Sequence, residues 1–196
     1  MSTIINATTT NGVVIQPDNS GSLVLQTNSG TTALTIDTSQ NVAFAKGFTV
    51  GATAAPAFSV YQNSSQTISS STFTKVQLQI EEFDTNSNFN NTGSTVGSAP
   101  SYSFLPTIAG YYQFNFSLDG TVAGLPMLYK NGSRFKDGGV NAGNAVGTAN
   151  TGSALAYANG TTDYFEFYFY QVSGSNSTTT GSSFATYFQA AMVRSA

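Results

Sequence analysis

The feature that most constrains this chain is the strict alternation of apolar and polar residues in several segments. In the clearest one, Gln113, Asn115 and Ser117 separate large apolar residues, which is the period of a strand with one buried face. Apolar residues with the spacing of an amphipathic helix are missing. The pattern predicts an all-β protein with core residues Tyr112, Phe114, Phe116, Phe165, Phe167, Phe169, Phe184 and Phe188.

The segment 164–170 is apolar or aromatic at almost every position. A strand with aromatic residues on both faces is expected to be buried on both. In a two-sheet sandwich one face meets the core, so the other needs a partner, and tyrosine suits such an interface. We expect Tyr164, Tyr168 and Tyr170 to form a trimer interface. The alternative is that these tyrosines only cap the face of the sheet.

Two regions of different texture divide the chain into residues 1–54 and 55–196. In the first, short apolar pairs recur about every ten residues with turn residues between them. Small residues and Pro56 mark a linker at 51–56. We interpret the first region as a β arm for attachment and trimerisation, carried by Val13, Ile15, Leu23, Leu25, Leu34 and Ile36.

The strands of this arm are too short to form a core of their own. Two apolar residues in each strand contribute only a few kcal/mol, whereas ordering the backbone costs ~1–2 kcal/mol per residue. Either three copies around an axis or one copy lying on another protein would make the arm stable. The alternative is a disordered low-complexity tail. The second region, with aromatic strands and long polar connections, indicates a sandwich or jelly roll.

Composition excludes several classes of function. Histidine and cysteine are absent, so Ser-His-Asp and Cys-His catalysis and the usual zinc sites are excluded, and we expect no enzyme and no cofactor. Net charge is −3, with six scattered Lys and Arg, which disfavours nucleic acid. Neither an apolar run of membrane-spanning length nor a signal peptide is visible. We therefore expect a soluble protein made in a cytoplasm.

Only 8 per cent of the residues are charged, against ~25 per cent in ordinary soluble proteins. Such a surface suits permanent contacts with neighbouring proteins, because few charges lose water when it is covered. The main carboxylate cluster is Glu81, Glu82 and Asp84. With Asn86 or Asn88 it could hold calcium. Solvated loop charge is the plainer interpretation, and we assign no metal.

Residues 57–193 resemble the head domains of complement component one-q and the tumour-necrosis-factor superfamily. The resemblance is carried by Ala57–Ser59, Phe83–Asp84 with Asn88 and Phe89, Phe104–Pro106, Ala109–Phe114, Leu128–Gly132 and Ser182–Phe184. In those heads the last of these motifs begins the final strand. The resemblance implies a ten-stranded jelly roll that assembles as a homotrimer and has no enzymatic activity.

The texture of the arm is similar to the repeats of bacteriophage fibres. An assembly-borne trimer of cytoplasmic origin fits a virion surface protein, and the absence of cysteine fits assembly in a reducing cytoplasm. We expect a capsid decoration (cement) protein that binds the major capsid protein. The alternatives are a short tail fibre or spike whose head binds a host receptor or surface glycan, and a free lectin-like binding module.

Overall fold

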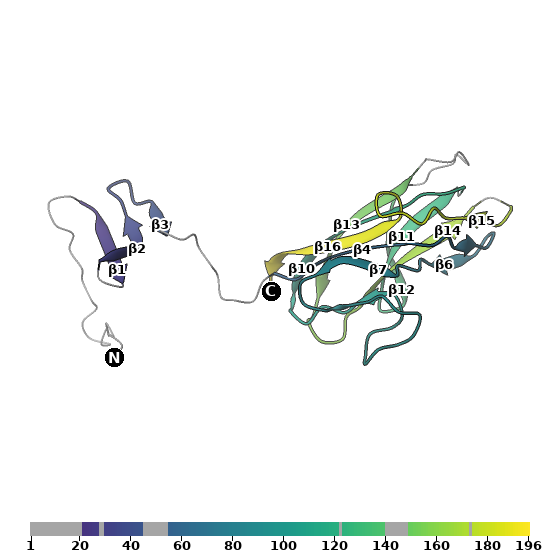
Figure 1. The fold of residues 1–196 in the computed structure, drawn as a ribbon, viewed down its shortest axis with the longest axis horizontal. Coiled ribbons are helices and arrows are strands. Elements are labelled where there is room, and N and C mark those ends of the chain that lie inside the picture. The colour runs from purple at the N-terminus through teal and green to yellow at the C-terminus, as the bar shows by residue number, and fades with distance from the viewer. Residues whose placement is uncertain (1–20, 28–29, 45–54, 122, 140–148, 173) are drawn as a thin grey trace. The chain divides into compact units, whose positions relative to one another are not determined.

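The computed structural model describes residues 21–27, 30–44, 55–121, 123–139, 149–172 and 174–196. The chain divides into two compact units, Met1–Thr53 and Ala54–Ala196, which are called the arm and the head below. All regular structure in the described residues is β (Figure 1). No helix in these residues is long and apolar enough to cross a membrane.

The arm contains one small antiparallel sheet, formed by β1 (Leu23–Thr27), β2 (Thr31–Ile36) and β3 (Val42–Phe44) in that order. Asp37 closes the turn between β2 and β3. Its carboxylate accepts hydrogen bonds from the backbone N–H groups of Ser39 at 2.8 Å and Asn41 at 2.9 Å. A hydrogen bond from the Asn41 side chain, together with these backbone bonds, lowers the pKa of Asp37. The only charged side chain of residues 21–44 therefore serves the turn.

The head is a sandwich of two antiparallel sheets with a small ribbon beside them (Figure 1). The β10 sheet has the order β13-β10-β16-β4-β7, and the β14 sheet has the order β12-β11-β14-β9-β8 with β6 also paired to β14. The strands of the β10 sheet are β4 (Ala57–Tyr61), β7 (Ile80–Asp84), β10 (Gly110–Leu118), β13 (Asn150–Ala158) and β16 (Tyr187–Ser195). The β14 sheet contains β6 (Phe73–Lys75), β8 (Phe89–Asn90), β9 (Ser103–Phe104), β11 (Gly124–Lys130), β12 (Ser133–Asp137) and β14 (Phe165–Gln171), and the ribbon pairs β5 (Thr67–Ile68) with β15 (Ser177–Thr178).

Aromatic rings fill the space between the two sheets. Phe114 of β10 lies 4.6 Å from Phe165 of β14, and Phe116 lies 5.1 Å from Phe167, measured between ring centroids. Phe58 packs against Phe104 at 4.4 Å. Of the core residues expected from the sequence, the structure buries Tyr112, Phe114, Phe116, Phe165, Phe167, Phe169 and Phe188.

The expectation for Phe184 is wrong, because its side chain is 86% exposed. Phe184 lies in a turn in which the backbone N–H groups of Ala185 and Thr186 both bond to the carbonyl of Ser182. Thr186 is fully buried and donates its hydroxyl to the Thr180 carbonyl. The turn therefore directs Phe184 to solvent, and the last strand begins only at Tyr187.

Gly152 provides a first test of this packing. It lies opposite Phe116 in the β10–β13 register, and a Cβ atom there would overlap the Phe116 ring. We expect Gly152→Ala to lower the free energy of unfolding by about 1–3 kcal/mol, measured by urea denaturation. Gly139→Ala is the control, since its Cβ would lie at an ordinary 3.7 Å from the Thr151 carbonyl oxygen. Equal stability of the two variants would contradict the observed packing.

Tyr112 is expected to lower the stability of the folded chain as the pH rises into the alkaline range. Its side chain is fully buried, its hydroxyl donates to the Ile108 carbonyl at 2.7 Å, and burial raises its pKa to about 12. Because the folded pKa exceeds the unfolded value of about 10, the contribution of Tyr112 to stability is complete below about pH 10 and is lost as the pH rises toward 12.

This contribution is measured by comparing wild type with Tyr112→Phe, which cannot ionise, in urea titrations at two pH values. Between about pH 9 and pH 11.5 we expect wild type to lose about 2 kcal/mol more stability than the variant. A stability difference between the two proteins that does not change with pH would contradict the assignment.

Candidate self-association site

The strand β13 has the reverse of the usual burial pattern for large and small side chains. Its inward positions are Ala154, Ala156 and Ala158, all buried, whereas Leu155 is 53% and Tyr157 is 42% exposed on the outer face. Burying a large apolar side chain is worth about 1.5–3 kcal/mol. A strand that points its large side chains outward is expected to contact a partner there.

The neighbouring strand β10 extends this outward apolar surface. Tyr111 pairs with Tyr157 in the register, and their ring centroids are 5.5 Å apart. Gln113 pairs with Leu155, and the Gln113 amide donates to the Ser153 hydroxyl at 2.8 Å. The exposed positions in the middle of these two strands are thus apolar or neutral.

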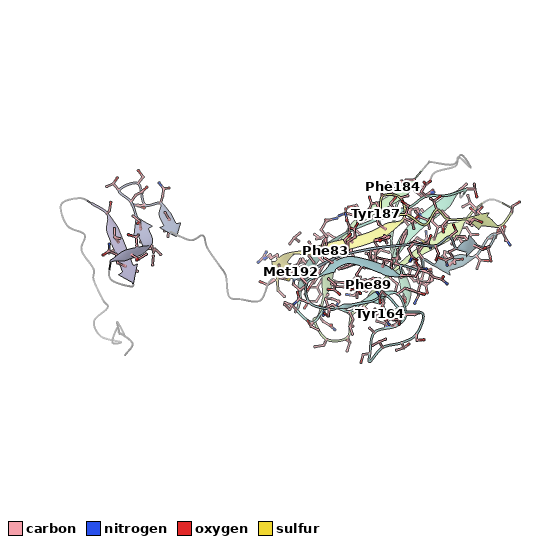
Figure 2. The ribbon with its side chains drawn as sticks, in the orientation of Figure 1. Phe83, Phe89, Tyr164, Phe184, Tyr187 and Met192 are labelled. Atoms are coloured by element: carbon pink, nitrogen blue, oxygen red, sulfur yellow. The ribbon has the colours of Figure 1, made fainter. Side chains whose placement is uncertain are left out.

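A shallow hollow of about 330 Å³ continues the same surface across β16, β4 and β7. Its lining includes Ala57, Ala190 and Ala191 together with the exposed Phe83 and Val193. Figure 2 labels Phe83 and Tyr187. Tyr187 lines a second hollow of about 570 Å³, whose other lining residues include Asn115, Ser153 and Asp137. We call this surface the β10 face; it comprises Tyr111, Gln113, Leu155, Tyr157, Phe83 and Val193.

The tyrosines expected at the trimer interface lie on the outer side of the other sheet or next to it. Tyr164 precedes β14, and Tyr168 and Tyr170 lie in it; all three are half-buried within the single chain. Tyr168 stacks on Tyr129 with 4.0 Å between centroids, and Tyr170 packs on Phe73 at 4.6 Å. Burial raises the pKa of Tyr168 to about 12. Two of the three tyrosines therefore have aromatic neighbours in their own chain.

Charged groups lie among these tyrosines. Glu166 is buried and forms an ion pair with Lys75, whose amino group also donates to the Ser101 carbonyl at 3.0 Å. The second carboxylate oxygen of Glu166 has no hydrogen-bond partner among the described residues. Arg134 pairs with Asp137 nearby on β12. An interface here would remove water from these charges.

In the acidic cluster, Asp84 holds the loop that follows β7. The Asp84 carboxylate accepts hydrogen bonds from the backbone N–H groups of Asn86 at 3.2 Å and Phe89 at 2.6 Å. Glu82 accepts from the Ser59 hydroxyl at 2.7 Å. Burial and the charge of Asp84 raise the pKa of Glu81. Across the described ranges, no three His, Cys, Asp or Glu side chains gather as metal ligands.

The arm residues expected to make contacts divide into two groups. Val13 and Ile15 lie outside the described residues. Leu23, Leu25, Leu34 and Ile36 lie in the arm sheet, where Leu23 pairs with Ile36 and Leu25 pairs with Leu34. Cross-strand partners share one face of a sheet, so these four side chains lie on the same side.

The comparisons with known proteins agree with the two-sheet architecture. No protein-family model and no curated protein matches the chain. Solved structures do match, among them the globular domain of zebrafish complement 1qA, with 15% identity over 73% of this chain and 100% of that one and a TM-score of 0.52. Murine APRIL matches with 8% identity over 71% and 100% and a TM-score of 0.54, and Eiger TNF from S. frugiperda with 7% over 73% and 96% and a TM-score of 0.51.

The head has the complement one-q/TNF jelly-roll fold. Sequence identities this low show a shared fold and do not show a shared function. The all-β jelly-roll fold expected from the sequence is thus confirmed. Tyr111, Leu155 and Tyr157 were not among the interface residues expected from the sequence. The signal for Leu155 and Tyr157 was the segment Ser153–Ala158, in which Leu and Tyr alternate with alanine.

Proposed function

We propose that this protein is a non-enzymatic structural and binding module that assembles as a homotrimer through the β10 face. The observation that carries the proposal is the inverted strand β13, which directs Leu155 and Tyr157 outward beside Tyr111. Charged groups do lie beside the β10 face: Lys130 Nζ is 5.8 Å from the Tyr157 ring centroid, and Arg194 pairs with Tyr111 in the register. Gln113 and Leu155, which pair with each other, are uncharged, so covering these two positions removes no water from a charged group. We propose three chains per assembly because the sequence resembles the complement one-q and tumour-necrosis-factor families.

Within this assembly, we place the β10 face at the trimer interface and leave the tyrosines of the β14 sheet outside it. The packing of Tyr168 on Tyr129 and of Tyr170 on Phe73 supports this choice. The buried Lys75–Glu166 pair supports it as well, because a second protein laid over this pair would have to complete the hydrogen bonding of Glu166.

The specific role that we propose is capsid decoration. Three arms from one trimer would engage the major capsid protein of a virion together, which raises the strength of attachment far above that of one arm. The sparse charge and the absence of cysteine suit a permanent assembly formed in a host cytoplasm. The second candidate is a short tail fibre or spike with a receptor- or glycan-binding head, which the partly exposed tyrosines on the β14 sheet favour.

Two measurements test the proposal. Sedimentation equilibrium of the purified chain should give three times the 20.4 kDa chain mass, and a monomer or dimer would overturn the homotrimer. Purified protein is then mixed with capsids stripped of it and imaged by electron cryo-microscopy. Density on threefold axes of the shell supports decoration, whereas density only at the tail vertex supports the fibre or spike.

A further inference from the structure

The arm sheet separates its residues into one aliphatic face and one mixed face. The register aligns Leu23, Ile36 and Val42 in one row across the three strands. The adjacent row on the same face contains Leu25 and Leu34. The opposite face is built around the row of Val24, Thr35 and Ala43. We call the first set of five residues, Leu23, Leu25, Leu34, Ile36 and Val42, the aliphatic face.

The described part of the chain does not bury this aliphatic face. Every residue from 21 to 26 and from 30 to 43 is at least partly exposed, and Val42 reaches 54% exposure. Each large apolar side chain left in water forgoes about 1.5–3 kcal/mol of burial free energy. The arm sheet therefore needs a partner that supplies an apolar surface of similar size.

The chemistry of the aliphatic face favours a second copy of itself as that partner. The five side chains present neither charge nor hydrogen-bonding group, so they match a surface that is equally apolar. Residues 21–44 contain one charged residue, Asp37, and its carboxylate is bonded to the turn between β2 and β3. Identical sheets can therefore approach one another with little charge repulsion and few unpaired polar groups.

We propose that three arm sheets, one from each chain, pack by their aliphatic faces around the axis of the trimer and form a closed stem. The proposal rests on the homotrimer proposed above, because the joined heads hold the three arms at high effective concentration. The face with Val24, Thr35 and Ala43, together with the turns, then points outward toward the particle.

Single-cysteine variants test this packing, because the natural chain contains no cysteine. Leu25 and Val24 are 44% and 43% exposed in the single chain and lie on opposite faces of β1. A lone arm sheet predicts similar maleimide-labelling rates for Leu25→Cys and Val24→Cys, since thiol reactivity follows access. The closed stem predicts labelling of Leu25→Cys that is slower by about tenfold or more. Val42→Cys and Ala43→Cys form a second pair on β3, which guards against a local effect at β1.

The rates are measured on the purified full-length chain, whose sedimentation is recorded in parallel, and again in the background of the head variant Leu155→Glu. Protection of Leu25→Cys in the trimer and its loss in the dissociated variant support the stem. Equal rates in a chain that sediments as a trimer overturn the stem but leave the trimer. Equal rates in a monomer overturn both. Protection that survives in the monomeric variant also overturns the stem, because the same chain then supplies the cover.

Discussion

Leu155→Glu is expected to convert the trimer into folded monomers. Leu155 is 53% exposed on the β10 face, so the substitution leaves the core between the sheets intact. In the trimer each new carboxylate would be buried without a partner. An unpaired buried charge costs several kcal/mol, which is on the order of a hundredfold or more in the association constant for each chain.

Sedimentation equilibrium and a thermal melt together check this outcome. The variant should sediment with the mass of one chain and keep the far-ultraviolet spectrum of a β protein. Val96→Glu is the matched control, because Val96 is 57% exposed in a loop of the head outside the β10 face. It should remain a trimer. Dissociation of both variants would mean that any exposed charge disrupts assembly, and the assignment of the β10 face would fail.

A third variant decides between the two sheets. Tyr170→Glu places the same charge among the tyrosines of the β14 sheet, where the sequence alone predicted the interface. We expect this protein to remain a trimer. A trimeric Leu155→Glu together with a monomeric Tyr170→Glu would move the interface to the β14 sheet and restore the prediction made from the aromatic segment.

The all-β fold could be predicted from the sequence because alternation is a local property. In β10, the polar residues Gln113 and Asn115 separate Tyr112, Phe114 and Phe116, and all three aromatic residues are buried. Each large ring between two sheets removes much apolar surface from water. The core therefore depends on residues whose own neighbours in the sequence reveal their orientation.

Phe184 could not be assigned in this way, because its environment depends on a turn. The hydrogen bonds to the Ser182 carbonyl and the burial of Thr186 set its direction. The Thr186 hydroxyl in turn bonds to the backbone of Asp119 and Thr180, which are not its neighbours in the sequence. An aromatic residue next to a strand has the same local signature whether it lies before or inside the strand.

The candidate interface failed to appear in the sequence analysis for a different reason. An aromatic strand such as β14 attracts attention, yet its outward rings find partners in β6 and β11, which are distant in the sequence. The alanines of β13 look unremarkable until the register shows that they face the core and that Leu155 and Tyr157 face outward. Which side chains of β13 face outward follows from its pairing with β10, and this pairing cannot be read from the composition of the chain.

Deleting residues 1–50 is expected to leave a folded, trimeric head that no longer attaches to the particle. The core and the β10 face lie in Ala54–Ala196, which forms a compact unit of its own. Attachment through three arms multiplies weak contacts into a strong one, so losing all three arms should lower the affinity for the particle by a factor on the order of a hundred or more.

This deletion is checked by co-sedimentation with stripped capsids, with the melting temperature and mass of the truncated head measured beside it. Substituting Leu23, Leu25 and Leu34 together by Ser in the full-length chain is the finer variant, since it weakens the aliphatic face and keeps the arm's length. Reduced attachment of both proteins indicates that an ordered arm sheet is needed to bind the particle. A truncated head that binds capsids as well as the full chain would transfer attachment to the head. The tyrosines of the β14 sheet would then become the leading candidate for the contact, because the proposed trimer uses the β10 face.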